Sequence, residues 1–345
     1  MTDNTAVAGS NTAPGDASTA STTPATAADT PGERRLPKIT VVGAGNVGAT
    51  TGLLLVLREL ADVVLIDIAE GVARGKALDI MQMRSNERFG PRISGTGSYA
   101  DTANSDIVVV TAGIPRRPGM TREELLEINS GIVRSVLNGA LEASPNALYV
   151  FVTNPLDVMC NLAWEIASSS PAALPPARLM GMGGVLDTAR FIHAIAEATG
   201  AEPAEIEALV VGAHGEAMVP LAQRARVGGR PLNELLSAEQ IKSVVDATVN
   251  GGAAVVELLQ TGSAFYAPAS SIVQMVTELL QPTGKILSVC ARLNGEYGIS
   301  DVSICVPVRL GKNGVEEVVE LELAPAELSQ LRASAEATKQ QLGRL

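Results

Sequence analysis

The sequence predicts an α/β fold, in which a doubly wound parallel sheet is followed by a second domain of the α+β type. Strand-like and helix-like segments alternate from residue 38 to about residue 180, and parallel strands need such helical crossovers between them. The later part of the chain groups its elements differently, with helices near 184–199, 238–260 and 268–280, then strands near 285–292, 301–309 and 315–322. We therefore expect one domain over residues 36–180 and another over 181–345.

The first predicted strand and helix meet at a glycine-rich turn. The β-branched run 39–42 is typical of a buried parallel strand, and the spacing G-x-G-x-x-G follows it at 43–48. In this motif Gly43 permits the tight turn, Gly45 lets the backbone approach a pyrophosphate, and Gly48 lets the helix pack closely on the strands. The first N–H groups of the helix, which is expected to reach about residue 60, would face the phosphates.

An acidic residue completes this motif. Asp67 ends the second apolar strand, 63–66, where a carboxylate can bond the ribose hydroxyls of NAD and would repel the 2′-phosphate of NADP. The strand, turn, helix and acid together indicate a Rossmann-type domain with NAD as its cofactor. The predicted cofactor-binding residues of this motif are Gly43, Ala44, Gly45, Asn46, Val47, Gly48 and Asp67.

The remaining elements continue the alternation. We expect a helix over 71–83, a weak strand over 92–97 and strong strands over 106–110 and 148–152. Thr121 precedes a helix and has Glu124 three residues on, which is the capping-box arrangement. The hairpin near the C-terminus is expected to turn at Asn313-Gly314, and a closing helix begins at about Ala324.

Composition limits the classes of function. A chain of 345 residues that is 46% hydrophobic and 18% charged fits a globular enzyme, and a net charge of −11 argues against nucleic acid or an anionic membrane as partner. The three cysteines, Cys160, Cys290 and Cys305, are far apart in the sequence and form no C-x-x-C pair. With only two histidines in the chain, we expect reduced cytoplasmic thiols, no disulfide frame and no metal site.

The N-terminal segment 1–35 is predicted to be a disordered, low-complexity tail. It is rich in Ala, Thr, Ser, Pro and Gly and shows no apolar periodicity. A targeting role is disfavoured because the first arginine is Arg34 and acids interrupt the segment at Asp3, Asp16 and Asp29. No uncharged apolar run of about 18 residues predicts a membrane span, and we expect a cytoplasmic protein.

Several polar residues follow the predicted strands. The loop 113–120 carries Arg116 and Arg117, with Arg122 just beyond it, and Asn154 ends the fifth strand. Because ligands bind at the carboxyl ends of parallel strands, these residues are candidates for a site. A solvated surface remains the alternative for any single arginine, and a plain Asn-Pro turn remains the alternative for Asn154.

Two further positions suggest proton chemistry. Asp187 and Arg190 stand three residues apart on one face of a predicted helix, where a surface ion pair is the simpler interpretation. His214, between Ala213 and Gly215 after a buried-looking strand, is better placed for proton transfer than for core packing. His193, in the middle of a helical pattern, is interpreted as a surface or packing residue.

Taken together, these motifs resemble the malate dehydrogenases of the lactate-dehydrogenase-like type. The resemblance runs from about residue 37 to the C-terminal region. It is carried by VVGAGNVG, VLID, TAGIPRRPGMTR, FVTNPLDV, MGGVLDTARF, GAHGEAMVP, GSAFYAPAS, GEYG and LGKNGVEE. It implies a Rossmann domain followed by a substrate-binding, catalytic domain, and reversible hydride transfer between (S)-malate and NAD.

The resemblance also implies roles for individual residues. His214 matches the general base, and Asp187 matches the carboxylate that orients its ring. Arg190 matches the residue that grips the C1 carboxylate of the substrate. Arg122 matches the lid arginine that polarises the reacting oxygen, and Arg116 matches the residue that reads the far end of a dicarboxylate.

Three more residues are implied to line the bound molecules. Asn154 matches a substrate contact, while Asn129, Val152 and Asn154 match cofactor contacts. One departure is Glu216 after the His-Gly pair, where the family commonly has Asp. The resemblance further implies a homodimer or homotetramer, and the family does not choose between them.

Three alternatives follow from the same residues. A lactate dehydrogenase is the nearest, but pyruvate would leave Arg116 desolvated without a partner, and the resemblance implies that Ala264 leaves room for a larger substrate. An NAD-dependent glycosidase would need a Cys–His metal site, which the sequence does not predict. An inactive NAD-binding protein is disfavoured because each catalytic residue type is present.

Overall fold

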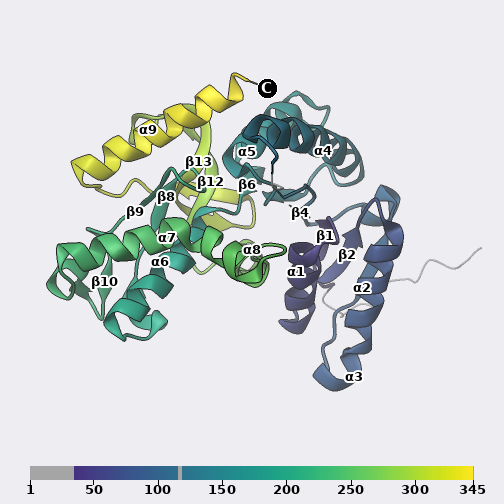
Figure 1. The fold of residues 1–345 in the computed structure, drawn as a ribbon. Helices are drawn as coiled ribbons and strands as arrows, with labels where there is room; N and C mark the ends of the chain where they lie inside the picture. The colour runs from purple at the N-terminus through teal and green to yellow at the C-terminus, as the bar shows by residue number, and fades with distance from the viewer. Residues whose placement is uncertain (1–34, 116–118, 345) are drawn as a thin grey trace, which may run out of the picture. The chain divides into compact units, whose positions relative to one another are not determined.

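A computed structural model gives the structure of residues 35–115 and 119–344. The chain from Leu36 onward forms one compact unit. Its first part is a parallel sheet with the strand order β3-β2-β1-β4-β5-β6. The chain adds strands on one side of β1 up to β3 and then on the other side from β4 onward. The predicted doubly wound sheet is therefore confirmed (Figure 1). The strands are β1 (Lys38–Val42), β2 (Asp62–Ile66), β3 (Ile93–Thr96), β4 (Ile107–Val110), β5 (Leu148–Phe151) and β6 (Leu179–Gly181).

Helices connect these strands on both faces of the sheet, as parallel pairing requires. Their bounds are α1 (Asn46–Leu57), α2 (Glu70–Gln82), α3 (Arg84–Glu87), α4 (Arg122–Ala143) and α5 (Leu156–Ser169). The capping box predicted at Thr121 and Glu124 is present at the start of α4. Short 3₁₀ helices lie at Tyr99–Thr102, Pro176–Arg178, Pro203–Glu205, Leu232–Glu234 and Glu296–Gly298.

The second part of the chain extends the same sheet with antiparallel strands. β12 pairs with β6, β13 with β12, and β8 with β13, so the sheet continues across the predicted boundary at residue 180. The two-domain division stays a prediction. The strands are β7 (Ile206–Glu207), β8 (Val210–Gly212), β9 (Met218–Pro220), β10 (Arg226–Val227), β11 (Arg230–Pro231), β12 (Ile286–Asn294), β13 (Ser300–Gly311) and β14 (Gly314–Val318). The helices are α6 (Gly184–Thr199), α7 (Ala238–Leu259), α8 (Tyr266–Leu280) and α9 (Pro325–Leu342).

The C-terminal hairpin differs slightly from its prediction. The turn between β13 and β14 is made by Lys312 and Asn313, and Gly314 pairs with Gly311 as the first residue of β14. Gly314 has a φ of +104°, which a side chain would disfavour. The strand expected over 315–322 ends at Val318.

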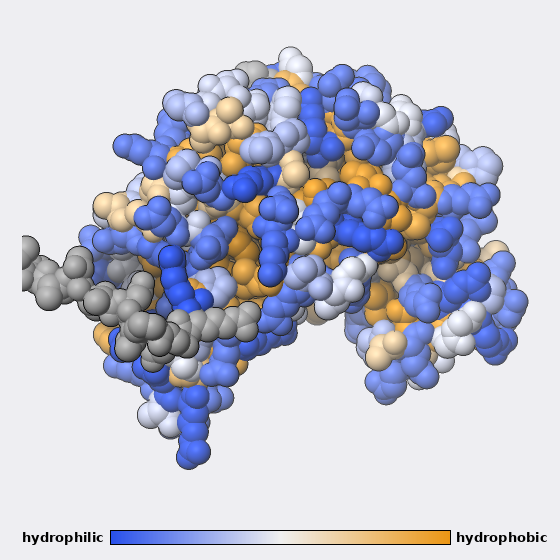
Figure 2. Space-filling view, turned by 180° about the vertical axis from the view of Figure 1, so that it is seen from behind, coloured by the Kyte–Doolittle hydropathy of each residue, from blue (hydrophilic) through white to orange (hydrophobic). Residues whose placement is uncertain are grey.

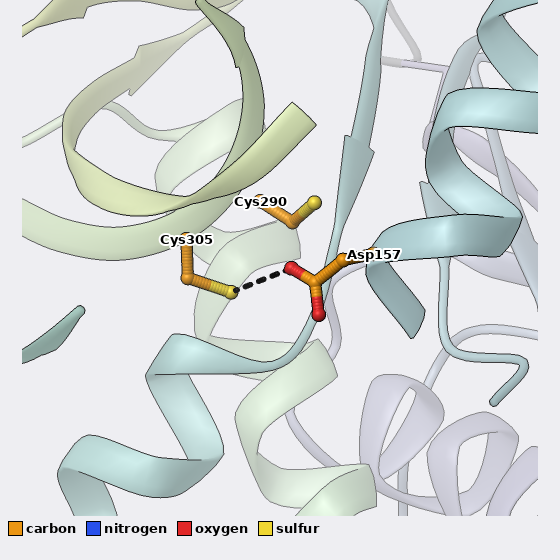
Figure 3. Close-up of side chains that lie close together, drawn as sticks. All are labelled: Asp157, Cys290 and Cys305. Atoms are coloured by element: carbon orange, nitrogen blue, oxygen red, sulfur yellow. Dashed lines mark hydrogen bonds between the residues drawn. The ribbon is translucent and has the colours of Figure 1, made fainter. Parts of the chain in front are cut away.

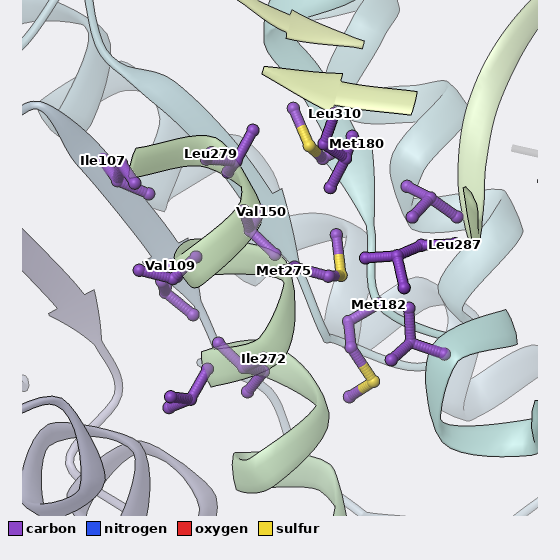
Figure 4. Packing of buried hydrophobic residues seen from close by; sticks show 14 of the residues in the cluster. Ile107, Val109, Val150, Met180, Met182, Ile272, Met275, Leu279, Leu287 and Leu310 are labelled. Carbon is purple, nitrogen blue, oxygen red and sulfur yellow. The ribbon is translucent and has the colours of Figure 1, made fainter. Parts of the chain in front are cut away.

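The α8 helix joins the parallel and antiparallel parts of the sheet through the core. Ile272, Met275 and Leu279 lie on one face of α8 and are at most 1% exposed. Figure 4 shows this face against Val109 of β4 and Leu287 of β12, within one continuous hydrophobic cluster. Each such side chain contributes about 1.5–3 kcal/mol when it is fully buried. This packing fixes the strand ends on which the candidate site is built.

Hydrophilic side chains cover most of the face of the molecule that is seen in Figure 2. Figure 2 shows one face on which hydrophobic side chains are seen between surrounding charged and polar ones. Among the residues that the structure describes, no helix is both long and apolar enough to span a membrane. The predicted tail lies outside the described residues, apart from Arg35.

Candidate active site

The glycine turn after β1 has the geometry that its motif predicts. Gly43 has a φ of +97°, and a Cβ there would lie 2.8 Å from the Ala112 nitrogen. A Cβ on Gly48 would lie 1.9 Å from the Gly43 carbonyl oxygen, so the helix can start here only without a side chain. Gly45 is different, because it is exposed and no atom lies within 4 Å of where its Cβ would be. Two glycines thus serve packing, and the third leaves open space.

The structure places Asp67 beside this turn. Its Oδ2 accepts the Ala44 N–H at 2.7 Å, and its Oδ1 accepts the Ala69 N–H at 2.9 Å. Gly45 caps α1 without a side-chain hydrogen bond. The start of α1 therefore has no carboxylate or hydroxyl cap of its own there, as suits an anion-binding helix terminus.

Asn129 organises the neighbouring strand ends through its amide. It is fully buried; its Nδ2 donates to the carbonyls of Ile114 at 3.1 Å and Asn154 at 2.7 Å, and its Oδ1 accepts the Ile114 N–H at 2.9 Å. The side chain thus holds the loop after β4 against the loop after β5. Val152 directly follows β5 and is half-buried, and Asn154 is exposed.

The fold brings His214, Asp187 and Arg190 together. His214 follows β8, and its Nδ1 lies 2.8 Å from Asp187 Oδ2 in the first turn of α6. The other carboxylate oxygen, Oδ1, accepts from Arg190 Nη1 at 3.4 Å. Asp187 is only 1% exposed, so the Asp187–Arg190 pair is not the surface ion pair of the simpler interpretation. An ionised carboxylate only accepts hydrogen bonds, so Nδ1 carries the proton and Nε2 keeps a lone pair.

This surrounding sets the protonation of the imidazole. Burial by itself lowers the pKa of His214, but Asp187, through its charge and its hydrogen bond, and the charge of Asp157 outweigh that effect. The pKa of His214 is therefore raised. Burial also lowers the pKa of Arg190, which the Asp187 carboxylate partly offsets.

Two adjacent glycines of α7 make room for Arg190. A Cβ on Gly251 would lie 3.1 Å from Arg190 Cδ, and one on Gly252 would lie 3.3 Å from Nη2. Paired glycines inside a helical pattern cost helix stability. Their presence in the sequence therefore indicates a place where a neighbouring group needs the space.

A cavity of about 690 Å³ lies in front of His214. Arg122, Asn154, His214 and Glu216 all line it, together with residues of α9. Arg122 Nη2 donates to Glu216 Oε1 at 2.8 Å, and both side chains are mostly exposed. The acid that departs from the family pattern is therefore the partner of the predicted lid arginine.

The other predicted positions fall as follows. Arg116 and Arg117 lie outside the described residues. His193 is exposed on α6, which confirms its interpretation as a surface residue. A smaller cavity of about 420 Å³ is lined by Val185, Thr188 and Ile192 of α6 and contains none of the predicted site residues.

The buried carboxylate of Asp157 contacts His214 and is close to the thiols of buried cysteines. Sequence reasoning missed this cluster. Cys290 and Cys305 are directly opposite each other on β12 and β13, and their sulfur atoms lie within 4.8 Å of each other and of an Asp157 oxygen (Figure 3). Cys160 interacts with Cys290. All three cysteines are free and buried. The strand register that joins the cluster cannot be read from cysteine spacing.

The cluster is built for neutral thiols. Burial raises the pKa of Cys290, and the Cys290 thiol together with burial raises the pKa of Cys305. Protonated thiols can donate weak hydrogen bonds to a carboxylate. The arrangement therefore favours donors to Asp157.

Two family models together match nearly the whole described chain. Residues 37–175 match the family model described as the lactate/malate dehydrogenase, NAD binding domain. Residues 184–344 match the lactate/malate dehydrogenase, alpha/beta C-terminal domain. The two matches leave the N-terminal segment uncovered.

Individual relatives are similar in sequence and fold. A malate dehydrogenase of Trichormus variabilis is 48% identical over 90% of this chain and 94% of its own length. A crystal structure of a Cryptosporidium parvum malate dehydrogenase has a TM-score of 0.85 with 39% identity, over 90% of this chain and 100% of its own. The lactate dehydrogenase of the same organism, complexed with lactic acid and β-nicotinamide adenine dinucleotide, has a TM-score of 0.86 with 37% identity, over 90% and 98%. Fold similarity alone therefore does not separate the two specificities.

Proposed function

This chain belongs to the lactate/malate dehydrogenase family, and on that basis we propose that it catalyses reversible hydride transfer between (S)-malate and NAD, giving oxaloacetate and NADH. The observation that carries the proposal is the His214–Asp187 contact of 2.8 Å beside Arg190. It brings together the proposed base, the carboxylate proposed to orient it and the cation proposed to bind the substrate. The names of the similar malate dehydrogenases support the substrate.

The proposed proton acceptor is Nε2 of His214. Since Nδ1–H is bonded to Asp187, the Nε2 lone pair is free to take the hydroxyl proton of malate, and the buried carboxylate stabilises the imidazolium that results. In the reverse direction the imidazolium returns that proton to the oxygen of oxaloacetate. General base catalysis of this kind contributes roughly 10²–10⁴-fold.

Three arginines are proposed to bind the substrate, with Asn154 beside them. Arg190 would grip the C1 carboxylate as a bidentate fork, and the glycines of α7 leave its guanidinium the space to do so. Arg122 would polarise the reacting oxygen, which requires it to leave Glu216. Arg116 would pair with the second carboxylate of oxaloacetate or malate.

The residues around the glycine turn fit NAD. Open space beside Gly45 and the uncapped start of α1 suit a pyrophosphate, and Asp67 suits ribose hydroxyls. The turn residues Gly43 to Gly48, with Asp67, Val152 and Asn154, would hold the cofactor, and Asn129 would act through the backbone that it fixes. When bound, NAD supplies the hydride acceptor.

L-lactate dehydrogenase, or another 2-hydroxy acid dehydrogenase, is the alternative function. A lactate dehydrogenase has nearly the same TM-score as a malate dehydrogenase. Malate is favoured because Arg116 would remain buried and unpaired beside the methyl group of pyruvate, a costly arrangement. We propose a small dicarboxylate as the substrate, and we propose a cytoplasmic location on the strength of the buried free cysteines.

A homodimer or homotetramer is proposed as the assembled form. Helix α7 exposes Val256, Leu258 and Leu259, and α2 exposes Val72 and Leu78. Apolar side chains gathered on helices in this way are common where another subunit packs. Sedimentation of the full chain tests this: a monomer at micromolar concentration would contradict it.

Steady-state rates test the proposed reaction. We expect kcat/KM for oxaloacetate to exceed that for pyruvate, and NADH to be preferred over NADPH. A preference for pyruvate would support the lactate alternative. Absence of turnover with both keto acids would contradict both.

A further inference from the structure

Asp157 lies next to His214 and lines the same cavity. It stands in the first turn of α5 and is only 4% exposed. Its Oδ2 accepts the backbone N–H of His214 at 2.7 Å. Its other oxygen faces the Cys305 thiol, with a sulfur–oxygen distance of 3.8 Å (Figure 3). A buried carboxylate thus contacts the main chain of the residue whose ring is to carry a proton.

No cation of the described residues forms a salt bridge with Asp157. Its partners are one backbone N–H and the thiols of Cys290 and Cys305, which are uncharged. A lysine or arginine in their place would cancel the field of the carboxylate. Neutral donors instead satisfy its oxygens and leave its charge to act on the nearest ionisable ring, that of His214.

The charged groups that face His214 come from several elements. Asp187 and Arg190 face it from α6, and Asp157 faces it from α5. The thiols of Cys290 and Cys305 approach from β12 and β13 and are neutral. Glu216, on the loop of His214, is exposed and already paired with Arg122, so solvent screens it. Asp157 is therefore the second buried negative charge beside the imidazole.

We propose that Asp157 is a positioning residue for His214, whose carboxylate fixes the histidine main chain and supplies a second negative charge that stabilises the imidazolium. This inference rests on the proposed function, in which His214 exchanges a proton with the substrate. Asp187 sets the direction of the ring and Asp157 sets the place of the loop, while both favour the protonated form.

The balance between the two reaction directions follows from this arrangement. In malate oxidation the hydroxyl proton moves to Nε2, and in oxaloacetate reduction it moves back to the new hydroxyl oxygen. Loss of one negative charge lowers the pKa of His214. His214 then remains neutral down to a lower pH, so malate oxidation should continue at lower pH. The protonated form of His214 is also lost at a lower pH, so oxaloacetate reduction should weaken at neutral and higher pH.

Asp157→Asn tests the proposal, because the amide oxygen can still accept the His214 N–H while the charge is gone. The chain has only two histidines, so NMR titration of the ring protons resolves His214 and uses exposed His193 as an internal reference. We expect the pKa of His214 to fall by roughly one unit. At pH 8, oxaloacetate reduction should fall roughly tenfold, which is the loss of protonated base that one unit produces.

Glu278→Gln is the matched control. Glu278 is also a buried carboxylate that accepts a backbone N–H, from Thr283 at 2.9 Å, but it lies on α8 away from the histidine. Its substitution should leave the pKa of His214 and both pH profiles unchanged. An equal shift in both variants would mean a general effect of losing a buried charge, and the proposal would fail.

The unmodified protein gives a second measurement that does not depend on the variant folding. Burial raises the pKa of Asp157 to about 6, against the opposing effect of His214, so the two groups should titrate together. The His214 resonance should therefore follow two steps. A folded, active Asp157→Asn protein with an unshifted His214, or a single step in the parent, would overturn this inference alone. An inactive parent would instead contradict the proposed function.

Discussion

The proposed cofactor turn and the proposed proton-transfer site of this protein are built in opposite ways. The turn comes from one stretch of chain, residues 43–67, and its groups are mainly backbone atoms placed by glycines. The proton-transfer site gathers side chains from α5, α6, β13 and the loop after β8. The turn needs positions without side chains, so that the backbone and a ligand can approach each other. The second needs charges that are present and held away from water.

The difference predicts different responses to substitution. In the turn, an added methyl group should damage either packing or cofactor binding, depending on which glycine receives it. In the proton-transfer site, a change that preserves shape but removes a charge or a lone pair should leave the fold intact and reduce the chemistry.

The largest effect is expected at the base itself. His214→Asn should lower kcat by roughly 10² or more and leave NADH binding nearly intact, because it removes a proton acceptor and no cofactor contact. Steady-state kinetics and NADH fluorescence titration measure the two quantities. His193→Asn is the control and should stay within a factor of a few. If the two variants exchanged these behaviours, the assignment of the base would be wrong.

Substrate choice should respond next. Arg116→Gln should weaken the oxaloacetate complex and relieve an unpaired charge beside pyruvate. A buried charge-assisted contact is worth roughly 2–5 kcal/mol, so the oxaloacetate-to-pyruvate ratio of kcat/KM should fall by at least tens of fold. Arg117→Gln should leave that ratio nearly unchanged. The reverse pattern would show that the position assigned to the substrate arginine is off by one residue.

The glycines of the turn separate packing from binding. Gly48→Ala places a Cβ 1.9 Å from the Gly43 oxygen, and such overpacking costs roughly 1–3 kcal/mol, so Tm should fall. Gly45→Ala meets no atom within 4 Å, so Tm should hold while KM for NAD rises roughly tenfold, the equivalent of about 1.4 kcal/mol. Thermal unfolding and KM for both variants give the comparison. A loss of Tm in Gly45→Ala would remove the distinction.

A smaller effect should appear where α7 meets Arg190. Gly251→Ala improves helix propensity by about 0.5–1 kcal/mol, yet its Cβ would lie 3.1 Å from Arg190 Cδ. We expect KM for malate to rise several-fold with no loss of Tm. Gly75→Ala, inside α2 with nothing within 4 Å, should raise Tm without changing KM. An unchanged KM in Gly251→Ala would mean that Arg190 adjusts freely.

The same contrast explains what the sequence could and could not predict. The glycine turn, Asp67 and the capping box at Thr121 were predictable because each depends on residues close together in the chain. The Asp187–Arg190 pair was visible as a helical spacing. Its burial was not, because burial depends on elements from the rest of the chain.

Long-range pairing decided the rest. The motif FVTNPLDV assigns no role to Asp157, and the distance between Cys290 and Cys305 along the chain does not bring them together. Their meeting depends on the register of β12 against β13 and on α5 packing beside them. No periodicity reveals that register, so only the structure could place a buried carboxylate and two thiols beneath His214.

The most direct test compares the pKa of His214 with the pH dependence of malate oxidation. At saturating NAD, the pH at which kcat/KM for malate falls on the acid side should coincide with the pKa of His214 measured by NMR under the same conditions, because a protonated imidazole cannot accept the hydroxyl proton. Both values should move down together in Asp157→Asn. An acid limb that differs from the His214 pKa, or that persists unchanged in His214→Asn, would contradict the account.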